Sequence, residues 1–146
     1  MRGFYRFLAF TMAAAVIVQA AAIAYGVFGL AHDVDAGVVV DKNYQDNLGL
    51  TIHGLDGMLV IPLLALVLFI SGIVLRSVNG ALRWASIVLG LVVLQVVLAM
   101  ISFGIPIVGL LHGTNALLIL LSALKASTLT RARVDAIVTQ SAVPVG

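Results

Sequence analysis

The sequence contains no cysteine, no glutamate and few charged residues of any kind. The absence of cysteine excludes disulfide bonds, thiolate metal sites, iron–sulfur clusters and covalent attachment of a c-type haem. Only 10% of the 146 residues are charged, whereas soluble domains usually contain about 25%. Because 62% of the residues are hydrophobic and the mean hydropathy is +1.20, the composition predicts an integral membrane protein. The net charge of +2 gives no indication of a nucleic-acid surface.

Four apolar segments stand out, at about 7–30, 50–75, 84–103 and 107–127. Each has close to the ~20 residues that a helix needs to cross the hydrocarbon core. A chain in lipid must satisfy its own backbone hydrogen bonds, so these segments are predicted to be helices. Gly104 and Pro106 separate the last two segments by a tight reversal. The predicted fold is all-α, with one four-helix membrane bundle over residues 1–130 and a short cytoplasmic tail at 131–146.

The basic residues predict the orientation of these helices. Seven of the eight lie before the first helix, between the second and third, or at and after the end of the fourth: Arg2, Arg6, Arg76, Arg83, Lys125, Arg131 and Arg133. Only Lys42 lies on the other side. By the positive-inside rule both termini face the cytoplasm, as in a multi-pass protein of the plasma (inner) membrane. Tyr5 and Trp84 are expected at the membrane–water interface.

The first segment also has features of a secretory signal peptide, because two arginines precede its apolar stretch. That stretch is longer than the roughly 7–15 residues of a usual signal core. We therefore expect a retained helix.

A histidine motif occurs twice in the chain. The second segment contains HGLDGML from His53 and the fourth contains HGTNALL from His112, so both follow the pattern H-G-x-[D/N]-[G/A]-x-L. The first and third segments each carry one mid-helix glutamine, Gln19 and Gln95. Since each pair runs outward and then back, we expect two tandem helix-pair repeats related by an axis along the membrane normal. The two histidines should lie at one depth, roughly one turn below the outer surface.

Polar side chains inside membrane helices are costly and usually face the bundle interior, which makes the two histidines candidates for a functional site. Neutral imidazole is a common axial ligand of haem iron, whereas zinc takes three or four protein ligands. The expected cofactor is therefore haem b, held by His53 and His112. Small residues on or near the same helix faces would leave room for a flat ring, namely Gly54, Gly57, Gly113 and Ala116.

The remaining polar residues of the motifs have two alternative roles. A ligating histidine usually donates its second nitrogen to a carboxylate or carbonyl, and that partner can come from a neighbouring helix. Asp56, Asn115, Gln19 and Gln95 are all candidates for this support. Alternatively, they only join helices by hydrogen bonds, worth on the order of 0.6 kcal/mol each. Asp56 is the costliest of the four to place in a membrane, because it can carry a charge.

The stretch LGLVVLQVVLAMISFG, the following tight turn and LLHGTNALLILLSAL resemble the helix pair found in each half of the haem A synthase family. That family joins two four-helix bundles, with a histidine on the second and fourth helix of each. Residues 7–127 look like one such bundle, and the resemblance implies haem ligands at His53 and His112. The chain has neither a second bundle nor the family's glutamate. The resemblance therefore implies a haem-binding scaffold like that of small di-histidine b-type cytochromes, rather than synthesis of haem A.

These observations predict a membrane b-type haem protein for electron transfer or haem handling near the outer face. One haem near one face does not carry electrons across the bilayer, so a redox partner, a quinone or a larger membrane complex is expected. Two other functions stay open. One is a cofactor-free accessory or anchor subunit of a larger complex. The other is a proton or metal relay centred on Asp56, which would require a homo-oligomer because four helices form a poor pore.

Overall fold

The computed structural model describes residues 1–45 and 47–129, and within these ranges the chain is helical with no β-strand. The elements in chain order are α1 (Arg2–Asp35), α2 (Leu48–Leu55), the π-helical turn η1 (Asp56–Val60), α3 (Ile61–Val74), α4 (Ala81–Ser102), the 3-10 turn η2 (Pro106–Val108) and α5 (Gly109–Thr128). This confirms the prediction of an all-α fold. The predicted tail at 131–146 lies outside the described residues.

Within the described residues, four continuous helical segments are long and apolar enough to cross a membrane: Arg2–Asp35, Leu48–Val74, Ala81–Ser102 and Pro106–Thr128. They correspond to the four segments predicted from the sequence. The first helix extends beyond the predicted 7–30 at both ends, and the bounds of the other three agree to within three residues.

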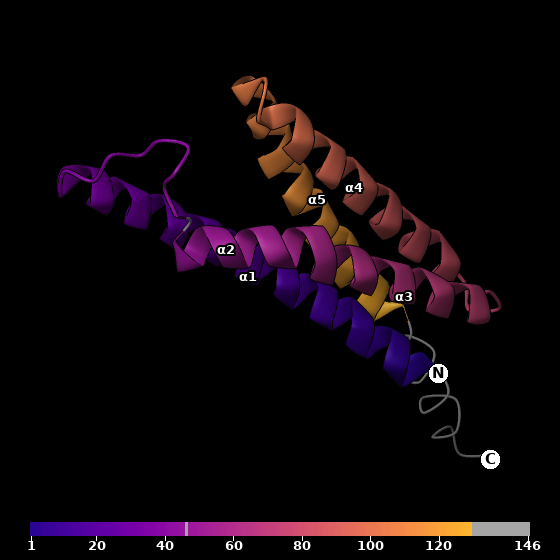
Figure 1. Ribbon diagram of the computed structural model, residues 1–146. Helices are drawn as coiled ribbons and strands as arrows, with labels where there is room; N and C mark the ends of the chain where they lie inside the picture. Colours follow the sequence, from indigo (N-terminus) through magenta and orange to yellow (C-terminus); the bar gives the residue numbers. More distant parts are fainter. Residues whose placement is uncertain (46, 130–146) are drawn as a thin grey trace, which may run out of the picture.

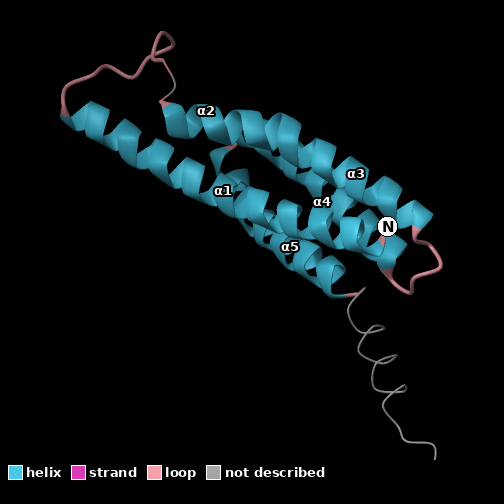
Figure 2. Cartoon of the chain, turned by 90° about the horizontal axis from the view of Figure 1, so that it is seen from below, coloured by secondary structure: helices cyan, strands magenta, loops and turns pink. Residues whose placement is uncertain are grey.

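The helices pack as antiparallel neighbours (Figures 1 and 2). Helix α1 packs against α2, α3 and α5, and α4 packs against α3 and α5. The start of α1 and the end of α5 lie at the same end of the bundle, whereas the α1–α2 loop and the α4–α5 turn lie at the other end (Figure 1). Towards this second end the α1–α2 pair and the α4–α5 pair diverge (Figure 1).

The hydrophobic core fills only the end of the bundle where α1 begins. Its buried side chains come from residues 5–16 of α1, 61–78 of α3 and the following loop, 81–92 of α4 and 119–126 of α5. Tyr5 is fully buried in this core, and its hydroxyl donates to the carbonyl oxygen of Ala81 at 2.8 Å. The expected position of Tyr5 at the membrane–water interface stays a prediction; within the bundle its hydroxyl finds a buried acceptor, as that of a core tyrosine usually does.

Helices α1 and α2 approach each other most closely at two glycines. A Cβ atom on Gly49 would lie 2.6 Å from the carbonyl oxygen of Ala22, and one on Gly26 would lie 2.8 Å from the amide nitrogen of Leu50. Asn47 caps the start of α2: its Oδ1 accepts from the Leu50 N–H at 3.1 Å, and its Nδ2 donates to the Gly26 carbonyl at 2.8 Å. The cap and the glycines together fix α2 against α1.

Helix α2 continues into α3 through a wider turn. In η1 the N–H of Ile61 bonds to the carbonyl oxygen of Asp56, five residues back. Pro62 follows directly and has no N–H to donate. Such π-helical turns inside helices occur frequently at functional sites. This one begins within the first histidine motif, so the second predicted segment is helical throughout its length but not uniform in pitch.

We predict that Gly49→Ala lowers the free energy of unfolding by about 1–3 kcal/mol, because the added methyl group meets backbone atoms that have no room to move aside. Thermal unfolding in detergent measures this effect. Gly90→Ala is the matched control, since a Cβ atom there meets nothing within 4 Å and the change raises helix propensity by about 1 kcal/mol. Equal unfolding temperatures for the two variants would contradict the close approach of α1 and α2.

Candidate functional site

A layer of polar side chains lies directly beyond the core. The outermost core residues include Val16, Ile61, Val92 and Ile119. One to two turns further along each spanning segment come the polar residues of the two motifs and the two glutamines, namely Gln19, His53, Asp56, Gln95, His112 and Asn115. The site residues expected from the sequence therefore follow the end of the core on all four segments.

His53 is anchored on α1 by Gln19. The Nδ1 atom of His53 is 3.2 Å from the main-chain oxygen of Gln19, and the Gln19 side-chain Nε2 donates to the main-chain oxygen of His53 at 2.9 Å. A carbonyl oxygen can only accept, so a neutral His53 carries its proton on Nδ1 and a lone pair on Nε2.

Gly57 makes room for this contact. A Cβ atom at position 57 would lie 2.5 Å from the Gln19 Nε2 atom, so only glycine admits the amide there. By contrast, a Cβ atom at Gly54 or Gly113 would have no neighbouring atom within 4 Å. Gly57, which was expected to leave room for a cofactor, accommodates the Gln19 amide instead.

His112 has a matching anchor on α4. Its Nδ1 atom is 3.2 Å from the main-chain oxygen of Gln95. Asn115 fixes the Gln95 side chain: its Nδ2 donates to the Leu91 carbonyl at 2.9 Å and to the Gln95 Oε1 atom at 2.7 Å. The Gln95 Nε2 atom then lies 3.2 Å from the His112 Nε2 atom. An amide N–H can only donate, so the His112 Nε2 accepts and the proton again sits on Nδ1.

The two imidazole rings lie close together in an edge-to-face arrangement. Their centroids are 6.4 Å apart and their planes meet at 67°. Two imidazole nitrogens bound at about 2 Å on opposite sides of one metal ion would place the ring centres roughly 6 Å apart. The spacing and the tautomers of His53 and His112 therefore fit a pair of axial ligands.

Several oxygens of this layer are buried without a hydrogen-bond partner. Three of the four such side-chain atoms in the described residues are Gln19 Oε1, Asp56 Oδ2 and Asn115 Oδ1. Leaving a buried acceptor unpaired costs about 1–3 kcal/mol. Asn115 itself is only 4% exposed. Unsatisfied groups of this kind are few in folded proteins and call for a specific cause, so their concentration here makes the layer a candidate site.

The described part of the chain contains no group of three or more histidine, cysteine, aspartate or glutamate side chains that could hold a metal ion. Two histidines alone do not satisfy zinc, which takes three or four protein ligands. The site therefore gives no support to a bare metal ion. It fits only a metal that brings its remaining ligands with it, as haem iron does.

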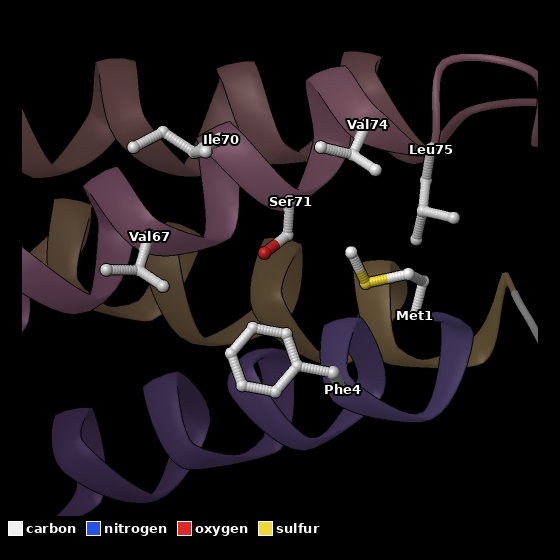
Figure 3. Close-up of a pocket in the computed structure, with 7 residues that line it drawn as sticks. All are labelled: Met1, Phe4, Val67, Ile70, Ser71, Val74 and Leu75. Carbon is white, nitrogen blue, oxygen red and sulfur yellow. The ribbon is translucent and has the colours of Figure 1, made fainter.

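Grooves lie on the surface of the described part of the bundle. One, of about 230 Å³, is apolar apart from Ser71 (Figure 3) and is lined by Met1, Phe4, Val67, Ile70, Ser71, Val74 and Leu75. It lies at the end where α1 begins and takes no part in the polar layer. Another, of about 270 Å³, is lined by Leu94, Leu98, Leu111, Thr114, Asn115 and Leu118. This second groove lies on α4 and α5, beside the polar layer.

Comparisons with protein-family models, with curated proteins and with solved structures find no match. The resemblance to the haem A synthase family therefore stays a prediction, and the function must be argued from the site.

Sequence analysis did not single out Asn47 or Leu91, although both hold the site in place. The preference of asparagine for the position before a helix was a usable signal for Asn47. Leu91 contributes only its main-chain oxygen, and the identity of a side chain carries no signal for such a role.

The hydrogen bonds predict that both His53 and His112 carry their proton on Nδ1 when neutral. Long-range ¹H–¹⁵N NMR spectra of the haem-free protein in detergent, recorded at alkaline pH, distinguish the tautomers directly. An Nε2–H tautomer at either histidine would contradict the anchoring by Gln19 and Gln95. The exposed His32 is the internal reference.

Proposed function

We propose that the protein is a multi-pass membrane b-type cytochrome in which His53 and His112 are the axial ligands of one haem. One observation carries this proposal: two imidazoles with Nδ1 anchored on main-chain oxygens have their ring centroids only 6.4 Å apart. Anchoring of Nδ1 leaves Nε2 as the ligating atom on both rings.

The arrangement of the helices supports a position in the outer half of the membrane. Arg2, Arg6, Arg76, Arg83 and Lys125 belong to the end of the bundle where α1 begins and α5 finishes. The positive-inside rule puts that end, and with it both termini, in the cytoplasm. The polar layer lies beyond the core, towards the other end, so the histidines belong to the outer half.

A bound haem would supply reversible one-electron transfer. The residues of the chain supply the rest. Main-chain oxygens of Gln19 and Gln95 hold the proton on each Nδ1, which orients the rings and makes Nε2 a better donor. The core beneath the layer keeps water from the inner side. Gly54 and Gly113 leave open space one residue after each ligand. A quinone, a soluble redox partner or a larger membrane complex would exchange electrons at the outer face.

We predict that the full chain, purified in detergent after expression with added haem, shows a Soret band that shifts on reduction and a sharp α-band. His53→Ala and His112→Ala should each abolish the six-coordinate spectrum, because each removes one axial ligand. His32→Ala is the matched control: it removes the third histidine, which is exposed near the end of α1, and should leave the spectrum unchanged.

Colourless wild-type protein under these conditions would contradict the proposal and favour a cofactor-free accessory subunit. Unchanged bands in both His53→Ala and His112→Ala would show that other residues hold the haem.

A further inference from the structure

The two histidines differ at the nitrogen that would bind iron. The Nε2 atom of His112 accepts a hydrogen bond from the Gln95 amide at 3.2 Å, whereas the glutamine beside His53 donates to that residue's main-chain oxygen instead. The His53 Nε2 atom therefore has no competing partner from Gln19. Loss of a metal bond would leave the His112 nitrogen with a hydrogen bond to re-form and the His53 nitrogen without one.

The two motifs differ at two corresponding positions, Gly57 against Ala116 and Asp56 against Asn115. These differences explain why only the glutamine beside His112 reaches the histidine Nε2 atom. Gly57 lets the Gln19 amide lie against the α2 backbone, where a Cβ atom would be 2.5 Å from Nε2. Ala116 occupies the corresponding place in the second motif and carries a methyl group, which hinders Gln95 from lying in the same way. Asn115 also donates to the Gln95 Oε1 atom, and Asp56, its counterpart as a carboxylate, has no N–H to donate.

We propose that His112 is the exchangeable axial ligand and that the reduced protein binds a small neutral diatomic molecule in its place. The inference rests on the haem-binding function proposed above. Gln95 stabilises the released imidazole by one hydrogen bond, which corresponds to roughly a two- to tenfold shift towards release. His53 gains nothing comparable on release, so it stays bound.

The surface next to His112 suits such a ligand. The groove of about 270 Å³ on α4 and α5 is lined by four leucines, Thr114 and Asn115. It therefore offers an apolar approach on the side of the bundle that carries His112, and its wall includes the residue that fixes Gln95. A small uncharged molecule dissolved in the lipid matches this surface, whereas an anion would find no basic side chain among the residues that line it.

Carbon monoxide is the probe for the test, applied to the dithionite-reduced, haem-loaded full chain and followed by the Soret shift. Wild-type protein is expected to bind carbon monoxide. Gln95→Leu should raise the dissociation constant about two- to tenfold, because the released His112 then loses its partner. Ala116→Gly should act in the same direction while removing only one methyl group, and it serves if Gln95→Leu fails to fold.

Ser86→Ala is the control on the same helix, since Ser86 bonds only to the Leu82 carbonyl at the exposed surface, and its affinity should match the wild type. Haem-loaded wild type whose spectrum is unchanged under saturating carbon monoxide would overturn this inference and leave the haem site intact. An equal rise in Gln19→Leu and Gln95→Leu would also overturn it, because the effect would then not belong to His112. A protein without a Soret band would instead contradict the proposed haem-binding function.

Discussion

The arrangement of the candidate site depends on the same kind of hydrogen bond in both helix pairs. In each pair a histidine Nδ1 donates to the main-chain oxygen of a glutamine on the preceding spanning helix. His53 makes it to Gln19 and His112 makes it to Gln95, each at 3.2 Å. A main-chain acceptor cannot rotate away as a side chain can, so the ring orientation follows from the packing of the two helices. This constraint decides which imidazole nitrogen of each histidine is available to bind a ligand.

The bundle has a packed hydrophobic core at one end and the polar layer of the candidate site beyond it. Small and aliphatic side chains of α1, α3, α4 and α5 form the core at one end, and the polar layer begins where that core stops. Beyond it the helix pairs diverge (Figure 1), and α2 is held on α1 by the glycine contact at Gly26 and Gly49. The tight end can therefore hold the four helices in register while the open end presents two imidazoles to each other.

Composition and apolar run length were sufficient to predict the helices, because a segment of about 20 apolar residues has few other ways to satisfy its backbone. The repeated motif drew attention to His53 and His112, and the single mid-helix glutamines of the other two segments drew attention to Gln19 and Gln95. The sequence could not show that the glutamines act through main-chain oxygens, nor that Gly57 receives the Gln19 amide. Those facts depend on how far one helix is shifted along another. The burial of Tyr5 could not be predicted for the same reason, since its acceptor on Ala81 is distant in the sequence.

We propose that two neighbouring histidines, His53 and His112, both bind one iron through Nε2. An electron paramagnetic resonance spectrum of the oxidised, haem-loaded full chain tests it most directly, because the spin state of ferric haem reports the number of strong axial ligands. We predict that the ferric haem gives a low-spin signal typical of two imidazole ligands. A high-spin signal from the wild-type protein would contradict it, since at most one histidine would then bind the iron.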